Sequence, residues 1–314
     1  MADPRPFRFG VQCSSPPQRG HDAWGELART CEGLGYSTLT VADHFDDQLA
    51  PIPALMAAAD ATTTLRVGAL VLCTDFTHPV VIAKEAATID VLSGGRFELG
   101  LGAGWMSTDY EQTGIPLEAP GTRIERLSEA LAVVDQLWSE TPCTFRGKHF
   151  TVEALDGRPK PLQRPRPPVL VGGGGRRVLS FAARSADIVG LNVDLRHGVI
   201  DDRAGPNATD DATASKVAWI RESAGARFGE IELHVRVHLV VVTSDRWGMG
   251  AALGPAFGLS PEQALRSPHA LAGSVEQIVD DLVERRERWG ISYIGLGVDA
   301  VHALAPVVAK LAGT

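Results

Sequence analysis

Residues 169–191 read VLVGGGGRRVLSFAARSADIVGL: an apolar run, four glycines, an amphipathic segment and a second apolar run. The runs at 169–171 and 188–191 are short and apolar throughout, as in strands that are buried on both faces. The segment between them fits a helix that begins directly after Gly175. This order predicts two parallel strands joined by a crossover helix.

The same alternation of strand and helix extends from this unit along the chain. The predicted strands are residues 7–12, 38–41, 66–72, 96–100, 169–171, 188–191, 233–242 and 292–296. The predicted helices are 23–34, 53–62, 79–92, 122–138, 213–228 and 274–290, one after Gly175 and one at the C-terminus. The helices at 122 and 274 each begin with a capping box, Thr122 to Glu125 and Ser274 to Gln277. Eight such units favour an α/β fold of the (β/α)8 TIM-barrel type over a doubly wound sheet.

Several segments interrupt this alternation. Residues 141–168 are rich in proline and contain Phe145 and Phe150 around a glycine, which predicts a β-hairpin excursion. Residues 193–211 form a polar segment that we interpret as a mobile loop, and residues 246–272 form an insertion with many glycines and prolines. We expect one barrel domain over residues 1–314, with insertions after strands four, six and seven.

Composition limits the classes of partner. The chain has 314 residues and 30 basic against 38 acidic side chains, a net charge of −8, and no Lys/Arg cluster that would attract nucleic acid. Its apolar runs are too short to cross a bilayer, and its N-terminus lacks the apolar core of a secretory signal, so we expect a cytoplasmic protein. The cysteines at 13, 31, 73 and 143 fit no zinc motif and no dense disulfide framework, which predicts buried thiols and no metal site.

In a (β/α)8 barrel the chemistry lies at the C-terminal ends of the strands. The second strand is followed by Asp43 and His44, a carboxylate beside the side chain best suited to move protons near neutral pH. The carboxylate can fix the imidazole tautomer or tune its pKa. The alternative is structural: an aspartate that caps a turn and a hydrogen-bonded histidine at the end of a strand.

Two glycine-rich segments follow later strands. The fourth strand leads into Gly102, Ala103, Gly104 and Trp105, where a dinucleotide fingerprint would need glycine in place of the tryptophan and a helix after it. Glycines there instead allow a planar ring to lie against the backbone, or simply form a tight turn. The fifth strand leads into Gly172, Gly173, Gly174, Gly175, Arg176 and Arg177 at the start of a helix, which predicts a phosphate site.

Other polar and aromatic residues favour structural roles. His78 precedes Pro79 at a predicted helix start and is typical of a helix cap. His234, Arg236 and His238 share one face of the seventh strand, but a central guanidinium would repel a metal ion, so we interpret them as structural. The tryptophans at 24, 138, 219 and 289 fall in predicted helices and are expected to pack rather than to stack on a ligand.

Five stretches of the chain resemble a known family, the luciferase-like flavin and deazaflavin oxidoreductases, and within it the actinobacterial branch that depends on coenzyme F420. They are VADHF at 41–45, VGALVL at 67–72, DVLSGGRFELGLGAGW at 90–105, PVLVGGGG at 168–175 and LAGSVEQI at 271–278. The run at 92–102 together with the glycine string is specific for the superfamily, and less specific for the choice of cofactor.

This resemblance implies a (β/α)8 barrel with the flavin or deazaflavin ring over the strand ends. His44 and Asp43 would flank the ring, and the residues from Gly102 to Trp105 would line it. The glycine string would hold the phosphate. Members of the family often have a cis non-prolyl bulge at the end of the third strand, which would fall here at Leu70 and Val71 against the face of the ring.

The leading hypothesis is therefore an oxidoreductase that moves a hydride between F420 and a small organic substrate. The alternative within the fold is a two-component monooxygenase that uses reduced FMN supplied by a separate flavin reductase. A homodimer and a flavin or F420 reductase are possible protein partners. A third hypothesis, a non-redox isomerase or aldolase that binds a phosphorylated metabolite, would need a lysine or paired carboxylates at strand ends. The five lysines, at 84, 148, 160, 216 and 310, all fall in predicted helices or in the excursion.

Overall fold

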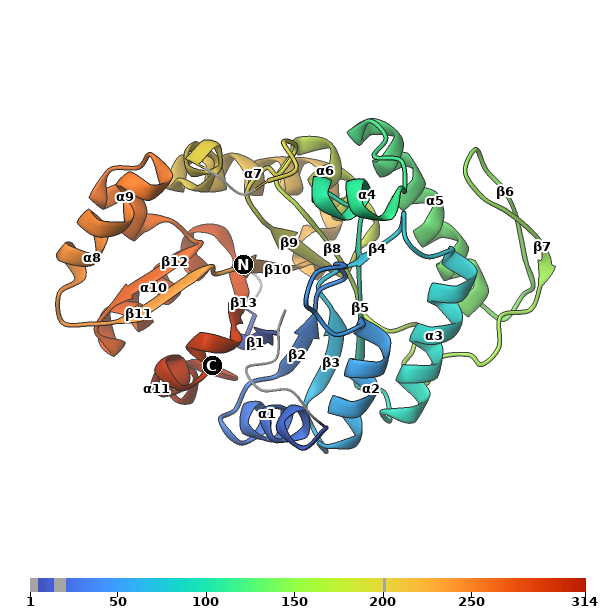
Figure 1. The fold of residues 1–314 in the computed structure, drawn as a ribbon, viewed down its shortest axis with the longest axis horizontal. Coiled ribbons are helices and arrows are strands. Elements are labelled where there is room, and N and C mark those ends of the chain that lie inside the picture. The colour runs from blue at the N-terminus through green and yellow to red at the C-terminus, as the bar shows by residue number, and fades with distance from the viewer. Residues whose placement is uncertain (1–4, 14–20, 200–201) are drawn as a thin grey trace.

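A closed parallel barrel forms the centre of the molecule (Figure 1). The computed structural model describes residues 5–13, 21–199 and 202–314. The barrel strands are β1 (Arg8–Gln12), β2 (Thr38–Val41), β3 (Arg66–Ala69) continued by β4 (Leu72–Cys73), β5 (Phe97–Gly102), β8 (Val169–Gly173), β9 (Ile188–Leu191), β10 (Glu232–Arg236) and β13 (Ile291–Gly297). They pair in the order β3-β2-β1-β13-β10-β9-β8-β5, and pairing between β3 and β5 closes the ring. The predicted (β/α)8 fold is confirmed.

Helices follow the strands on the outside of this barrel (Figure 1). They are α1 (His21–Gly33), α2 (Pro51–Asp60), α3 (Pro79–Leu92), α5 (Pro120–Trp138), α6 (Arg176–Ser185), α7 (Asp210–Ala224), α10 (Val275–Trp289) and α11 (Val301–Leu311). A short additional helix, α4 (Ser107–Thr113), lies between β5 and α5. The tryptophans at 24, 138 and 289 are buried in this layer and Trp219 packs against it, as predicted.

The helix starts test three sequence predictions. The capping box of α10 is present, with Ser274 accepting from the N–H of Gln277 and the Gln277 side chain accepting from the N–H of Ser274. His78 caps α3 by accepting from the N–H of Val80, as expected. The capping box at Thr122 is wrong, because α5 begins earlier, at Pro120, whose fixed φ suits the first turn.

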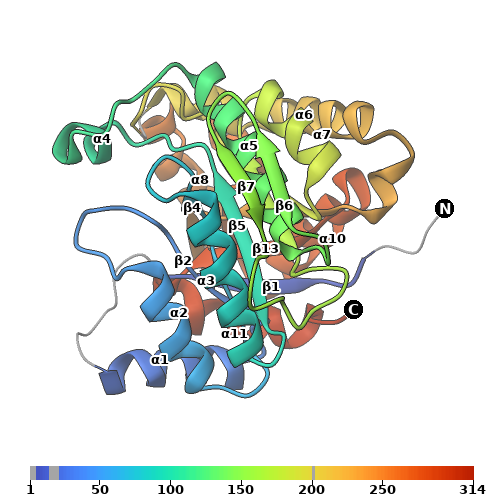
Figure 2. The same cartoon turned by 90° about the vertical axis from the view of Figure 1, so that its right-hand side faces the viewer.

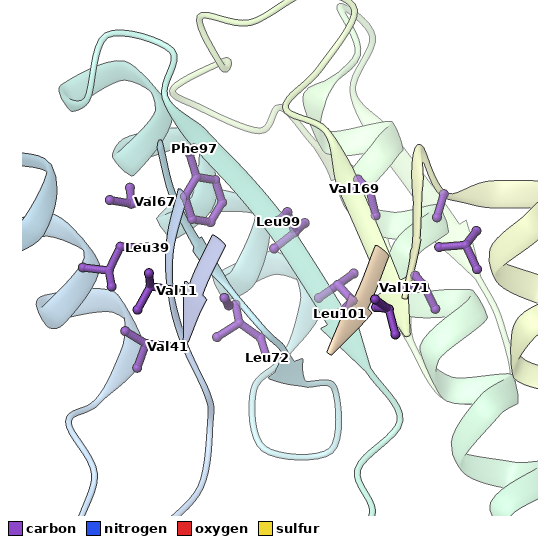
Figure 3. Packing of buried hydrophobic residues seen from close by; sticks show 14 of the residues in the cluster. Val11, Leu39, Val41, Val67, Leu72, Phe97, Leu99, Leu101, Val169 and Val171 are labelled. Carbon is purple, nitrogen blue, oxygen red and sulfur yellow. The ribbon is translucent and has the colours of Figure 1, made fainter. Parts of the chain in front are cut away.

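The core lies mainly between the strands and the helices. Side chains on the outward face of the strands are almost completely buried there (Figure 3), including Val11, Leu39, Val67, Leu99 and Val171. Alternate residues point into the barrel, where a smaller cluster contains Leu170, Ile188 and Tyr293. Burial on both faces explains why the strands are apolar throughout. All four cysteines are buried free thiols, as predicted.

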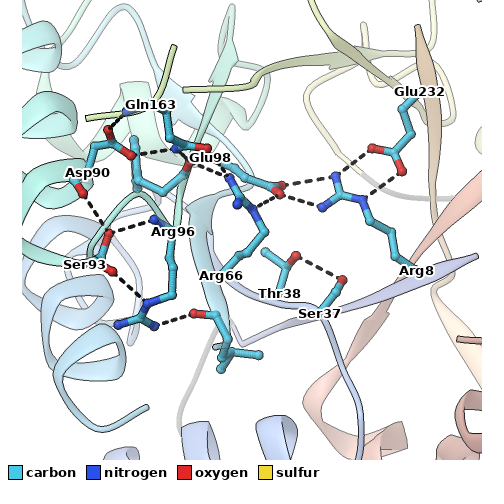
Figure 4. Close-up of polar contacts among 12 residues, drawn as sticks. Arg8, Ser37, Thr38, Arg66, Asp90, Ser93, Arg96, Glu98, Gln163 and Glu232 are labelled. Atoms are coloured by element: carbon cyan, nitrogen blue, oxygen red, sulfur yellow. Dashed lines mark hydrogen bonds and ion pairs between the residues drawn. The ribbon is translucent and has the colours of Figure 1, made fainter. Parts of the chain in front are cut away.

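A charged layer fills the N-terminal end of the barrel (Figure 4). Arg8 bonds Glu98 at 2.6 Å and Glu232 at 2.7 and 2.8 Å, and Arg66 bonds Glu98 at 2.6 Å. Burial alone would raise the pKa of Glu98, but the two guanidinium groups outweigh it and hold that pKa below its ordinary value. This end of the barrel is a structural network, and the opposite end remains for a ligand.

Two excursions lie at opposite sides of the barrel (Figures 1 and 2). One is the hairpin of β6 (Cys143–Arg146) and β7 (Thr151–Leu155), which pair antiparallel and confirm the hairpin expected at 141–168. The other contains β11 (Leu239–Val242), α8 (Arg246–Leu253), the 3-10 turn η3 (Pro255–Phe257), α9 (Pro261–Arg266) and β12 (Ala270–Gly273).

This second excursion corrects the prediction of one strand over residues 233–242. The barrel strand β10 ends at Arg236, and the N–H of Val237 still bonds the carbonyl of Gly295 at 2.7 Å. The chain then leaves the barrel, and β11 pairs in parallel with β12 instead. Residues 239–242 still form a strand, because β12 at the end of the excursion supplies a partner strand outside the barrel.

Smaller differences concern loops and ends. The expected strand 66–72 is interrupted at the Leu70–Val71 peptide, which is cis, as the family resemblance implied. The expected helix 213–228 begins earlier, as α7 at Asp210, because the side chain of Thr209 accepts from the N–H of Ala212. It ends at Ala224, where the 3-10 helix η2 (Gly225–Glu230) follows. The expected loop 193–211 includes the 3-10 helix η1 (Asp202–Ala208), while its residues 200–201 lie outside the described residues. A last 3-10 turn, η4 (Val298–Ala300), precedes α11.

Candidate functional site

A cavity of about 780 Å³ opens at the C-terminal ends of the barrel strands. Its volume lies within the usual range for a small-molecule or cofactor site. The structure brings every residue that the sequence singled out to this cavity: Asp43, His44, Leu70, Val71, Gly102, Ala103, Gly104, Trp105, Gly172, Gly173, Gly174, Gly175, Arg176 and Arg177. Their shared location follows from the parallel strands, since all the carboxyl ends meet at one end of the barrel.

His44, just after β2, is held by a carboxylate from another part of the chain. Its Nδ1 lies 2.7 Å from Oδ2 of Asp109 on α4, and Oδ1 of Asp109 accepts from the N–H of Phe45 at 3.2 Å. The indole of Trp105 packs edge-on against the imidazole, with 5.7 Å between ring centroids. Asp109 is buried, with 4% of its surface exposed. The hydrogen bond at Nδ1 leaves Nε2 as the ring nitrogen available for proton exchange with a ligand.

Asp43 does not make this contact. Its Oδ2 accepts from the N–H of Cys73 at 3.0 Å and so ties the end of β2 to β4. Burial raises the pKa of Asp43, and the Cys73 N–H and His44 act in the opposite direction. Asp109, and not Asp43, is therefore the carboxylate that holds His44 at Nδ1. The sequence analysis missed Asp109, which lies on α4 after the fourth barrel strand.

Leu70 and Val71 form part of the cavity wall between β3 and β4. The carbonyl of Leu70 accepts from the side-chain amide of Gln12 at 2.9 Å. Val71 approaches the backbone of β5 so closely that a Cβ at Gly102 would overlap its side chain. Glycine at position 102 therefore permits this close packing.

The segment from Gly102 to Trp105 is held by a buried arginine. Arg123 on α5 donates to the carbonyls of Ala103 and Gly104, and its Nε donates to the carbonyl of Glu118 at 2.9 Å. These bonds fix the turn that carries Trp105 toward His44. Arg123 is a second residue that the sequence analysis missed, since it lies inside a segment interpreted only as a helix start.

The glycine string joins β8 to α6. Gly175 is the N-cap residue and offers no side-chain cap, so the first N–H groups of α6 are left for another acceptor. A Cβ at Gly174 would overlap the backbone of Val193 and Asp194, whereas a Cβ at Gly175 would meet only Oδ2 of Asp194, at 3.7 Å. The glycine string thus passes close to the backbone of Val193 and Asp194 and leaves the N-terminus of α6 open. An open helix N-terminus suits an anion.

Arg176 and Arg177 lie at the rim of this site. Arg176 pairs with Glu222 at 2.9 Å and Arg177 pairs with Glu125 at 3.0 Å, with 61% and 58% of the side chains exposed. Exposed pairs of this kind are weak. Backbone N–H groups, rather than these guanidinium groups, are the donors closest to the helix start.

The end of β10 contributes polar residues that the sequence analysis interpreted as structural. Arg236 and His238 both line the cavity, next to Asn192 from the end of β9. Nε of Arg236 donates to Oε1 of Gln12 at 2.5 Å, and Nε2 of His238 lies 3.3 Å from Oδ1 of Asn192. Their place at strand ends was the available signal. The described residues contain no group of three His, Cys, Asp or Glu that could hold a metal ion.

Comparisons with known proteins identify the family to which the chain belongs. The family model of luciferase-like monooxygenases matches residues 7–246. The chain belongs to this family. It is similar to the FMNH2-dependent dimethylsulfone monooxygenase of Pseudomonas putida, with 26% identity over 86% of this chain and 75% of that protein. It is equally similar to an F420-dependent glucose-6-phosphate dehydrogenase of Nakamurella multipartita, with 26% identity over 92% of this chain and 84% of that protein.

A solved structure supports the fold. The F420-dependent tetrahydromethanopterin reductase of Methanopyrus kandleri superimposes with a TM-score of 0.76 at 18% identity, over 98% of this chain and all of that one. Because the family model matches residues 7–246, the chain is a luciferase-like oxidoreductase, which favours redox chemistry over the isomerase or aldolase hypothesis. None of the helices in the described part of this luciferase-like protein is long and apolar enough to cross a membrane.

Proposed function

We propose that this luciferase-like protein is an oxidoreductase that transfers a hydride between coenzyme F420 and a small organic substrate. The observation that carries the proposal is the pair of His44 and Asp109 at the cavity, with 2.7 Å between Nδ1 and Oδ2. Hydride transfer to a carbonyl carbon, or from the carbinol carbon of an alcohol, must be matched by proton transfer at the attached oxygen. An imidazole whose other nitrogen is held by a buried carboxylate is suited to that proton transfer.

The residues present fit a phosphate-bearing flavin or deazaflavin. The glycine string presents open backbone donors at the start of α6, and a Cβ at Gly175 would meet only Oδ2 of Asp194, at 3.7 Å. Leu70, Val71 and Trp105 give the cavity apolar surface against which a planar ring can pack. When bound, a deazaflavin supplies a two-electron hydride carrier that needs no oxygen.

The chain's own residues divide the remaining work. The N–H groups after Gly175 hold the phosphate, and the turn fixed by Arg123 places Trp105 beside His44. His44 takes a proton from an alcohol substrate, or returns one to a carbonyl, through Nε2. Asp109 keeps the imidazole oriented through the hydrogen bond at Nδ1. Asp43 fixes the end of β2 through the N–H of Cys73.

The alternative is a monooxygenase that uses reduced FMN with a separate reductase. It is favoured by the similarity to the FMNH2-dependent enzyme of Pseudomonas putida, and backbone donors at the glycine string bind the phosphate of either cofactor. The experiment is a binding titration with F420, F420H2, FMN and reduced FMN, followed by turnover under strict anaerobiosis.

The expected result is tightest binding of the deazaflavin, with product formed without oxygen and without an FMN reductase. Oxygen-dependent product formation with reduced FMN, and none with F420, would instead establish the monooxygenase alternative. A variant with Asp109→Asn should lose turnover with either cofactor while binding it normally.

A further inference from the structure

A polar wall at the ends of β9 and β10 has no role in the function proposed above. Asn192, Arg236 and His238 form this wall, and all three line the cavity. The glycine string lies on the other side of β9, and the N–H of Asn192 bonds the carbonyl of Gly173 at 3.1 Å. The polar wall is therefore a neighbour of the phosphate site but consists of side chains rather than backbone donors.

Arg236 is a partly buried cation without a carboxylate in contact. Its Nε donates to Gln12 and its Nη1 to the carbonyl of Val237, which leaves Nη2 without a bond to any of the described residues. No described carboxylate lies within 4.0 Å of its nitrogens, although Asp299 acts on it from farther away. Burial lowers the pKa of Arg236 to about 10, so it is still charged at neutral pH.

Asn192 offers a second unused donor. Its Oδ1 accepts from the N–H of Val193 at 2.8 Å and lies 3.3 Å from Nε2 of His238. Both contacts involve the oxygen, so the amide nitrogen of Asn192 takes part in neither. That nitrogen has no bond to a described residue. Burial, and then Arg236, lower the pKa of His238 to about 4, so the imidazole is neutral and donates to Oδ1.

A second cation, fully buried, lies behind the polar wall. Nζ of Lys216 on α7 donates to the carbonyls of Asn192 and Asn207 at 2.8 and 2.7 Å, and 1% of the residue is exposed. In the described chain no carboxylate pairs with it either, and Asp194 acts only at longer range. Arg236 is partly buried and Lys216 fully buried, and neither contacts a described carboxylate, so an anion from outside would compensate this positive charge.

We propose that the polar wall is an anion subsite that takes the carboxylate of an organic-acid substrate. Nη2 of Arg236 and the amide nitrogen of Asn192 are its donors, and a flat carboxylate matches the planar guanidinium. A phosphate is already provided for by the backbone donors of the neighbouring glycine string. The inference rests on the proposed function in one respect: it assigns the bound anion to the substrate rather than to the cofactor.

The test compares acids with their uncharged esters. Pyruvate, phenylglyoxylate and 2-oxoglutarate, and the methyl esters of each, are titrated calorimetrically into the protein saturated with oxidised F420 or FMN, whichever it binds. At least one acid should bind ten-fold or more tightly than its ester. Arg236→Gln should reduce this preference to less than two-fold, while Arg236→Lys should keep part of it.

The matched control is Arg196→Gln. Arg196 also lines the cavity, but 64% of its side chain is exposed and it pairs with Asp194. It should retain the full preference for the acid. If Arg236→Gln does not fold, Asn192→Leu removes the other donor and should weaken acid binding at least five-fold with ester binding unchanged.

The inference would be overturned by no preference for any acid, by an unchanged preference in Arg236→Gln, or by an equal loss in Arg196→Gln. Acid that binds the protein without cofactor but not the saturated protein would give the subsite to the cofactor and also overturn the inference. The outcomes separate the two proposals. Acid preference in a protein that does not bind F420 refutes the proposed function alone, and F420 binding without acid preference refutes the subsite alone.

Discussion

His269 should make the stability of the fold depend on pH in a way that can be calculated. It is buried beside the polar wall, and its Nδ1 donates to the carbonyl of Arg236 at 2.8 Å. Burial is the main cause that lowers its pKa from 6.5 to about 3. Between these two pKa values His269 is protonated in the unfolded chain but not in the native protein. The free energy of unfolding must therefore fall as the pH drops below 6.5.

The size of the effect follows from this difference. Each pH unit in which only the unfolded chain is protonated costs about 1.4 kcal/mol, so lowering the pH from 7 to 5 costs about 2 kcal/mol for this residue. His269→Asn retains an amide donor for the Arg236 carbonyl but cannot titrate. Between these two pH values, the variant should therefore lose about 2 kcal/mol less stability than the parent.

The assay is urea unfolding followed by circular dichroism at pH 7, 6 and 5 for the parent and the variant. Carboxylates that titrate in this range contribute equally to both proteins and cancel in the comparison. The control is His302→Asn on α11, where the side chain is exposed and in water in both the native and the unfolded state. The reasoning is refuted if His269→Asn loses as much stability as the parent when the pH falls.

Three further predictions concern the site and the barrel. His44→Ala should lower turnover by about 10² to 10⁴ with little change in melting temperature, because it removes the proton-transfer group; full turnover with a lowered melting temperature would make His44 structural. Gly175→Val should weaken cofactor binding at least about ten-fold in a fluorescence titration, because a side chain there covers the N–H groups of α6, whereas Gly229→Val, where a Cβ meets nothing within 4 Å, should bind as the parent does. Glu98→Gln should destabilise the barrel by about 3 kcal/mol in urea, since Arg8 and Arg66 lose their shared buried carboxylate. The exposed pair of Arg146 and Glu153 gives the comparison, since Glu153→Gln should cost less than about 0.5 kcal/mol; equal losses would contradict a role for the buried network.

The order of strands and helices, and the end of the barrel that carries the site, were determined by the sequence alone. Short apolar strands such as β8 and β9, with the amphipathic α6 between them, can be predicted from the sequence. The periods of apolar residues that distinguish strands from helices depend only on residues that are neighbours in the chain. The glycine string and His44 could be placed at the cavity for the same reason: each directly follows a strand. Local pattern failed where a strand found an unexpected partner, as at β11.

Only the tertiary structure decided which side chains meet within the cavity. His44 pairs with Asp109, 65 positions away, rather than with the adjacent Asp43, and Arg236 reaches Gln12 across 224 positions. The sequence period says which residues follow a strand, but not how a loop of irregular backbone folds back over the barrel. The physical reason is that hydrogen bonding and burial depend on distances in space. Those distances are set by the closure of the eight strands, which brings residues from β1, β2 and β10 to one end of the barrel.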